Sequence, residues 1–242
     1  MSEFISKSVG LTHIGRVRVE NQDAFLSNDE HGFYIVADGL GGLAKGLEAA
    51  QFTVKHLAGC LARAIGSAGS AQIDPQSYLK ELLIETSNQL PTVIKADSGS
   101  TVVVALLIEN RVIIANLGDS PAYLFRNNTL RLLSKEHNLA KLWVERGQLT
   151  PEQAMVHPAR NQLYAFVGFN GEAQVYTNET SLNRGERLLL CTDGLTAMVP
   201  EAMISKVLAE ESDLKAAAEK LIEMANAAGG YDNITIILIE IS

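Results

Sequence analysis

The chain has 242 residues, of which 47% are hydrophobic and 20% are charged, and its formal net charge at pH 7 is −8. These values are typical of a globular protein with a sizeable core, built as one domain or two small ones. The negative charge argues against non-specific binding to nucleic acid, which needs a basic surface. No apolar run is long enough to span a bilayer, and the N-terminal residues contain no signal-peptide core, so we expect a cytoplasmic protein.

The chain contains two cysteines, Cys60 and Cys191. Two cysteines do not make a disulfide framework. Cys60 falls in a helical pattern and Cys191 in an apolar strand, so both are predicted to be small buried thiols in a reducing compartment.

The first quarter of the chain predicts strands followed by a helix. Two short strands are expected within residues 4–26, around a polar loop at 15–23, and a buried apolar strand follows at 33–37. A long helix is predicted over residues 44–65. Its apolar residues recur at helical spacing and form one stripe, namely Leu47, Ala50, Val54, Leu57, Leu61 and Ile65.

Residues 66–70 are rich in glycine and serine, which predicts a flexible break. A second helix is expected to begin at Pro75, because proline is favourable at the first helical position. Pro91 is expected to interrupt or end that helix near Leu90.

The second half predicts mostly strands, with one excursion. Residues 98–134 read as strands with hairpin turns at Glu109-Asn110 and Asn127-Asn128. Residues 137–171 contain short helical pieces among turn-forming residues, which indicates a long surface connection of the kind that is often functional.

Two more strands, two helices at about 200–210 and 213–228, and a final strand at 234–239 complete the chain. Strands come in consecutive runs with helices grouped between them, which favours an α+β fold of antiparallel sheets over a doubly wound parallel sheet. No repeat or long linker is visible, so residues 1–242 are predicted to form a single domain.

Four aspartates stand at the ends of predicted strands, far apart in the sequence: Asp38, Asp119, Asp193 and Asp232. Taken alone, the Asp-Gly after the strand at 33–37 is more simply explained as a hairpin turn. If all four strand ends share one rim of a sheet structure, however, the carboxylates repel one another unless cations neutralise them. Oxygen ligands without Cys or His favour Mg²⁺ or Mn²⁺ over Zn²⁺.

Arg18 lies in the polar loop between the first two strands. A guanidinium beside such a cluster could bind a phosphate with two hydrogen bonds. A surface arginine is the simpler interpretation of Arg18 alone, and Arg16 is a competing candidate.

Arg18 and the four aspartates stand in sequence motifs whose order along the chain resembles that of the bacterial metal-dependent protein phosphatases, the type 2C serine/threonine phosphatases. The resemblance spans about residues 8–240. Its motifs are Arg18-Val19-Glu20-Asn21-Gln22-Asp23, Ala37 to Gly42, Gly118-Asp119-Ser120-Pro121, Cys191 to Leu195, and Asp232 to Thr235.

The resemblance implies a four-layer αββα sandwich, in which two antiparallel sheets are flanked by helices, with a flap near 137–171. It implies two Mn²⁺ or Mg²⁺ ions at one end of the sheets. Asp38 would bridge them, the Gly39 carbonyl would be a further ligand, and Asp193 and Asp232 would bind the first ion. Asp119, together with Asp193, corresponds to a third, weaker site.

The same resemblance implies that Arg18 binds the substrate phosphate and that Asp23 holds water bound to the metal. The implied reaction is hydrolysis of phosphoserine and phosphothreonine in proteins by a water that bridges the two ions, without a phosphoenzyme. The expected partners are phosphorylated proteins and a cognate Ser/Thr kinase, with no nucleic acid and no membrane. A monomer is expected.

Three positions depart from the family pattern. Gln22 stands where many members have Glu, Leu40 where some have a histidine proposed as a general acid, and Pro121 where an arginine is usual. The acid must then be water or another group such as His13, although His13 is more simply explained as an ordinary strand-end histidine. Two alternatives remain open, a non-catalytic phosphoprotein-binding regulator on the same fold and a phosphatase of small phosphate esters.

Overall fold

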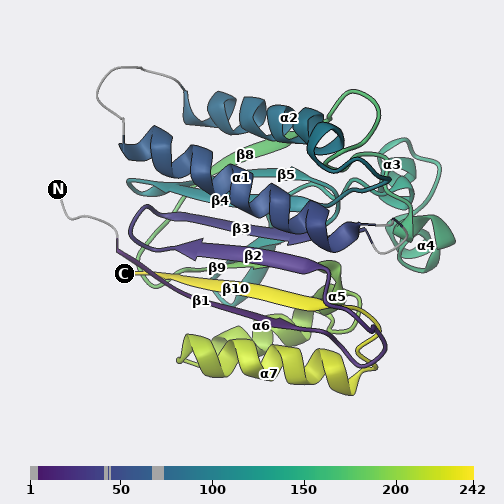
Figure 1. Ribbon diagram of the computed structural model, residues 1–242. Helices are drawn as coiled ribbons and strands as arrows, with labels where there is room; N and C mark the ends of the chain where they lie inside the picture. The colour runs from purple at the N-terminus through teal and green to yellow at the C-terminus, as the bar shows by residue number, and fades with distance from the viewer. Residues whose placement is uncertain (1–4, 41–42, 44, 67–73) are drawn as a thin grey trace.

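In the computed structural model of the chain, which describes residues 5–40, 43, 45–66 and 74–242, two five-stranded sheets pack face to face (Figure 1). Every pair of neighbouring strands is antiparallel. The first sheet contains, in order, β1 (Ser6–His13), β10 (Ile234–Ile241), β9 (Arg187–Cys191), β6 (Ala122–Arg126) and β7 (Thr129–Leu132). The second contains β2 (Asp23–Asn28), β3 (Phe33–Asp38), β4 (Val102–Ile108), β5 (Arg111–Leu117) and β8 (Tyr176–Ser181).

Two helices cover the outer face of each sheet (Figure 1). Helices α1 (Gly46–Gly66) and α2 (Pro75–Val93) lie on the second sheet. Helices α6 (Glu201–Glu210) and α7 (Leu214–Ala227) lie on the first. The predicted four-layer αββα sandwich is therefore confirmed.

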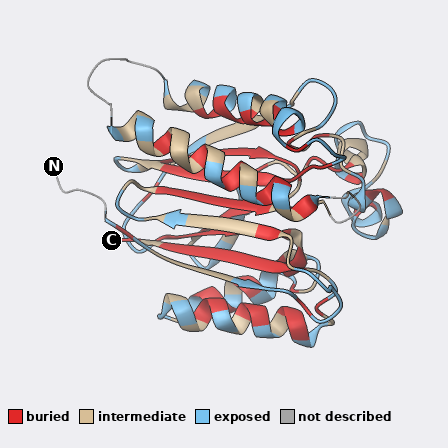
Figure 2. Ribbon diagram, in the orientation of Figure 1, coloured by how far each residue is buried: buried red, intermediate tan, exposed pale blue. Residues whose placement is uncertain are grey.

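Three apolar layers hold these four layers together, and β3 shows how. Phe33, Ile35 and Ala37 face the core under α1 and α2, whereas Tyr34 and Val36 face the core between the sheets. Successive strand residues point to opposite faces, so a strand that is covered on both sides must be apolar throughout. Figure 2 shows β3 buried along its length. Each large side chain buried in this way contributes roughly 1.5–3 kcal/mol.

The segment between β7 and β8 forms the predicted excursion. It contains α3 (Leu139–Glu145), α4 (Pro151–Val156) and the short 3-10 helix η1 (Pro158–Asn161). Asn138 and Thr150 cap the starts of α3 and α4 with their side chains, and a small apolar cluster of its own joins the three pieces. This flap lies at the end of the sandwich where β3 ends and α1 begins (Figure 1).

Two expectations about helices need correction. Helix α2 continues to Val93, past Pro91, and the Ile94 N–H closes it by donating to the Leu90 carbonyl over 2.8 Å. Pro91 is tolerated in the last turn because it is exposed and only one internal hydrogen bond is lost. A short helix, α5 (Asp193–Thr196), was not predicted and directly follows β9.

The predicted break at 66–70 falls almost entirely outside the described residues, and Gly66 itself is the last residue of α1. The hairpin turns are confirmed, since Glu109, Asn127 and Asn128 have positive φ between β4 and β5 and between β6 and β7. In the part of the chain that the structure describes, no helix has the length and apolarity needed to cross a membrane.

Candidate functional site

A pocket of about 330 Å³ opens at one end of the sandwich, and the four strand-end aspartates Asp38, Asp119, Asp193 and Asp232 all line it. Asp38 ends β3, Asp119 follows β5, Asp193 follows β9, and Asp232 precedes β10. These strands belong to both sheets. The packing of the two sheets therefore brings together carboxylates that are up to 194 residues apart in the sequence.

Asp38 is held at the centre of this arrangement by the backbone. Its N–H donates to Thr101 Oγ1 over 3.1 Å, and its carbonyl accepts from the Thr101 N–H over 2.8 Å. The next residue, Gly39, also lines the pocket, and its N–H donates to the Gln22 carbonyl over 3.1 Å. A Cβ at position 39 would lie 2.3 Å from the Gly46 carbonyl oxygen, so only glycine fits there.

The pocket disfavours charge on its carboxylates. Burial, and then the neighbouring aspartates, raises the pKa of Asp38 well above its usual range. Burial followed by the charge of Asp193 does the same to the pKa of Asp119. For Asp193, burial and Asp232 raise the pKa to about 6, although Arg18 and Arg160 oppose the shift. Neutralisation by a cation would relieve this repulsion.

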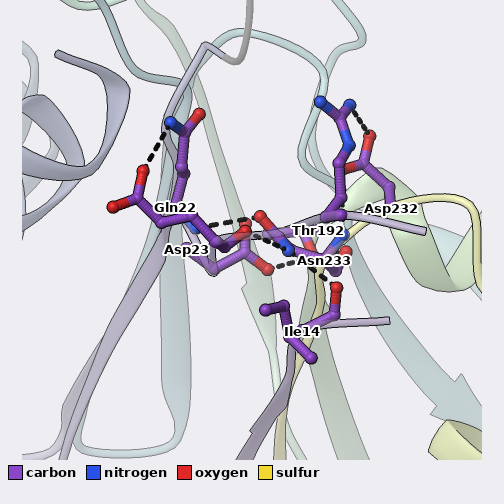
Figure 3. A network of polar contacts seen from close by, with 8 residues as sticks. Ile14, Gln22, Asp23, Thr192, Asp232 and Asn233 are labelled. Carbon is purple, nitrogen blue, oxygen red and sulfur yellow. Dashed lines mark hydrogen bonds and ion pairs between the residues drawn. The ribbon is translucent and has the colours of Figure 1, made fainter. Parts of the chain in front are cut away.

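Asp23 lies beside Asp38, as its cross-strand partner on the neighbouring strand β2. Its side chain is buried, and Oδ2 accepts a hydrogen bond from Thr192 Oγ1 over 3.0 Å (Figure 3). Oδ2 also accepts from Thr235 Oγ1 over 2.6 Å. Burial is the main reason that its pKa rises to about 7. The other oxygen, Oδ1, is buried without a hydrogen-bond partner among the described residues, which marks it as an acceptor for a small ligand such as water.

Arg18 points into the same pocket and pairs with Asp232. Its Nη2 donates to Asp232 Oδ2 over 2.7 Å, and this bond is the main reason that the pKa of Arg18 is raised. The other Asp232 oxygen accepts from the Asn233 N–H over 2.8 Å. In the described part of the chain, no group of three or more His, Cys, Asp or Glu side chains is arranged to hold a metal ion. A cation would have to compete with Arg18 for Asp232.

Arg16, the competing candidate for phosphate binding, and His13, the candidate general acid, both lie outside the aspartate pocket. Arg16 and His13 line a different hollow, together with Ile222, Glu223 and Asn226 on α7. His13 Nδ1 accepts from the Gly15 N–H over 2.9 Å, which is the behaviour of an ordinary loop-anchoring histidine. Neither residue lines the aspartate pocket.

Arg160 and Asn161 of the flap line the pocket, and no functional role was predicted for either from the sequence. The sequence does show a basic residue shortly after His157-Pro158, but that segment was predicted only to form a flap. Leu40 and Gln22 also line the pocket, whereas Pro121 does not. Both cysteines are free thiols, and Cys191 is buried in β9 as predicted, whereas Cys60 in α1 is only half-buried and not buried as predicted.

His137 connects the strand end at Asp119 to the start of the flap. The backbones of His137 and Gly118 are hydrogen-bonded, and His137 Nδ1 accepts from the Gly118 N–H over 3.1 Å. Burial, with a smaller effect from Lys135, lowers the pKa of His137 to about 4. The imidazole is therefore neutral in the folded protein at neutral pH.

This neutral histidine predicts a pH-dependent stability. An unfolded histidine titrates near pH 6.5, so its stabilising contribution is complete above pH 6.5 and is lost as the pH falls toward 4. We expect His137 to lower the free energy of unfolding by on the order of 2 kcal/mol between pH 7 and pH 4.5. Urea unfolding of wild type and His137→Asn at both pH values tests this. Equal changes in the two proteins would contradict it.

Comparison with known proteins places this chain in a family. Residues 9–237 match the family model described as protein phosphatase 2C. The chain is 36% identical over 239 residues to the serine/threonine phosphatase stp of Listeria welshimeri, with 95% of this chain and 93% of that protein covered.

Solved structures agree with the sequence comparison. The fold matches the S. agalactiae serine/threonine phosphatase with a TM-score of 0.88 and 28% identity, covering 98% of this chain and 100% of that one. It also matches the catalytic domain of the serine/threonine protein phosphatase PstP in complex with two manganese ions, with a TM-score of 0.81, 25% identity, and 98% and 99% of the two chains covered. This chain therefore belongs to the protein phosphatase 2C family, as a serine/threonine protein phosphatase of the bacterial type.

Proposed function

We propose that the protein hydrolyses phosphoserine and phosphothreonine in proteins with the help of two divalent ions, Mn²⁺ or Mg²⁺, and that it opposes a Ser/Thr kinase. We propose further that residues 1–242 act as one catalytic domain. The observation that carries the proposal is the convergence of four strand-end aspartates and Arg18 on one pocket. The manganese ions in the similar PstP structure support it.

The residues of the pocket fit such ions. The donors are carboxylate and carbonyl oxygens, the ligands that Mn²⁺ and Mg²⁺ prefer. Burial, and then the neighbouring carboxylates, raises the pKa values of Asp38 and Asp119, so a cation that neutralised these groups would be favoured. The unpartnered Oδ1 of Asp23 adds an acceptor immediately behind them.

The assignment of ligands is the one that the family resemblance implies, and the lining of the pocket by these residues supports it. Asp38 would bridge the two ions with the Gly39 carbonyl as a further ligand, and Asp193 and Asp232 would hold the first ion. Asp119 would serve a weaker third site together with Asp193. When bound, such a pair of ions lowers the pKa of water and neutralises negative charge on a phosphoryl group.

The protein's own side chains would bind and orient the substrate. Arg18 presents a guanidinium, whose planar donors match phosphate oxygens, once it leaves Asp232. Arg160 supplies a second positive charge at the same pocket. Asp23 Oδ1 would accept a hydrogen bond from water and hold it in place, while Thr192 and Thr235 fix the carboxylate.

The proton for the leaving oxygen is expected to come from water. No histidine lines the pocket among the described residues, and Leu40 stands where some family members carry one. His13, the alternative considered from the sequence, lies in the separate hollow beside α7.

The test is phosphate release from a phosphothreonine peptide and from a nucleoside monophosphate, each with Mn²⁺, with EDTA, and with Mn²⁺ restored. We expect release from the peptide with Mn²⁺, loss of release with EDTA, and recovery on adding Mn²⁺. Faster release from the nucleotide would favour the phosphatase of small esters. Bound Mn²⁺ without any turnover would favour the non-catalytic regulator.

A further inference from the structure

The side chain of Asn233 ties the loop at residues 14–22, which carries Arg18, to the segment that carries Asp232 (Figure 3). Asn233 is 4% exposed. Its Nδ2 donates to the Ile14 carbonyl over 2.9 Å and to the Glu20 carbonyl over 3.0 Å, and its Oδ1 accepts from the Gln22 N–H over 2.9 Å. Both N–H groups and the oxygen of the amide are thus engaged with the backbone of a single loop.

The three anchoring points lie on both sides of Arg18. Ile14 precedes it by four residues, and Glu20 and Gln22 follow it by two and four. Another hydrogen bond also links this loop to the segment before β10, since the Arg16 N–H donates to the Gly230 carbonyl over 2.7 Å. Gly15 has φ +83°, and a Cβ there would lie 2.2 Å from the Asp232 carbonyl oxygen, so the backbones of the two segments are in close contact.

The Asn233 amide is also linked to Gly39 through one further residue, Gln22. Gln22, whose N–H is held by Asn233, accepts at its carbonyl from the Gly39 N–H over 3.1 Å. Asn233 therefore connects Arg18, Asp232 and Gly39, which come from three separate parts of the chain. A buried amide with all its hydrogen bonds made rigidifies the groups that it joins, and loss of one partner is costly.

We propose that Asn233 is a positioning residue, whose amide holds the 14–22 loop in the conformation that directs Arg18 into the pocket. Asn233 itself borders the pocket, but its amide N–H groups and oxygen are bonded to backbone groups, so it is expected to act through Arg18 rather than on phosphate directly. This inference rests on the proposed function, in which Arg18 binds the phosphoryl group. It makes a prediction about phosphate affinity that does not depend on turnover.

The experiment is a double-mutant cycle of Asn233→Ala and Arg18→Ala. The readouts are the dissociation constant of inorganic phosphate in the presence of Mn²⁺, from calorimetry, and KM and kcat for a phosphothreonine peptide. Each single variant is expected to weaken phosphate binding by about 10-fold or more, and the double variant is expected to bind phosphate no more than about 2-fold more weakly than Arg18→Ala. KM is expected to rise more than kcat falls.

Asn178→Ala is the matched control, because the Asn178 amide donates to the Leu133 carbonyl over 3.0 Å and does not line the pocket. It should lower the melting temperature without changing phosphate affinity. If Asn233→Ala does not fold, Asn233→Asp keeps the size of the side chain while removing both N–H donors, and the same cycle applies.

Two results would overturn the inference. One is an additive cycle, in which the loss from Asn233→Ala is as large without Arg18 as with it. The other is unchanged phosphate affinity in a folded Asn233 variant. If phosphate binding follows the cycle but no phosphopeptide is hydrolysed, the proposed function fails while the positioning role of Asn233 stands.

Discussion

Asp193→Asn is expected to reduce Mn²⁺-dependent hydrolysis of a phosphothreonine peptide by about 100-fold or more. The substitution removes one of the carboxylates that are proposed to bind the first ion, and losses of this size are typical when a preorganised charge is removed from a catalytic site. Calorimetric titration should show Mn²⁺ binding weakened in parallel. Asp97→Asn is the matched control, because Asp97 is exposed and does not line the pocket.

The same substitution should have the opposite effect on the metal-free fold. In the absence of a cation, Asp193 lies among Asp38, Asp119 and Asp232, and burial together with Asp232 raises its pKa to about 6. A group whose folded pKa is raised in this way destabilises the folded state once the pH exceeds its unfolded pKa near 4. In EDTA at pH 8, Asp193→Asn should therefore melt at a higher temperature than wild type, with the difference disappearing toward pH 4. A lower melting temperature at pH 8 would contradict the proposed carboxylate repulsion.

Arg18→Ala is expected to change the affinities for phosphate and for Mn²⁺ in opposite directions. Phosphate should bind about 10-fold or more weakly, because a bidentate, charge-assisted partner is lost. Mn²⁺ should bind more tightly, because Arg18 Nη2 donates to Asp232 Oδ2 over 2.7 Å and competes with the ion for that carboxylate. A Mn²⁺ titration without phosphate and a phosphate titration at saturating Mn²⁺ measure the two effects separately.

Two other arginines provide the controls for Arg18→Ala. Arg16 lies two residues away in the same loop but lines the separate hollow, so Arg16→Ala should change neither affinity. Arg160 lines the pocket but does not bond to Asp232 among the described residues, so Arg160→Ala should raise the affinity for Mn²⁺ less than Arg18→Ala does. Equal tightening by both would indicate a general effect of positive charge, and no tightening by Arg18→Ala would show that the ion pair does not compete.

Most strands and helices, and the carboxylate character of the pocket, could be predicted from the sequence. The apolar run before Asp38 predicts a strand buried on both faces, and the structure confirms it for β3, because apolar burial on two sides leaves a pattern in the local sequence. The family motifs, read in order, predicted the αββα sandwich and singled out the four aspartates that meet in the pocket. Pro91 wrongly predicted the end of a helix, since an exposed last turn tolerates the loss of one hydrogen bond, and the short helix α5 was not predicted.

The contacts between side chains in the pocket depend on the tertiary structure and could not be predicted from the sequence. Arg18 meets Asp232 across 214 positions, Thr192 meets Asp23 across 169, and Asn233 meets Gln22 across 211. No local periodicity encodes these contacts, because they depend on how two sheets pack and on how the 14–22 loop folds back onto the start of β10. For the same reason, the placement of Arg18 rather than Arg16 in the pocket, and the approach of Arg160 from the flap, follow from long-range packing and not from the spacing of residues along the chain.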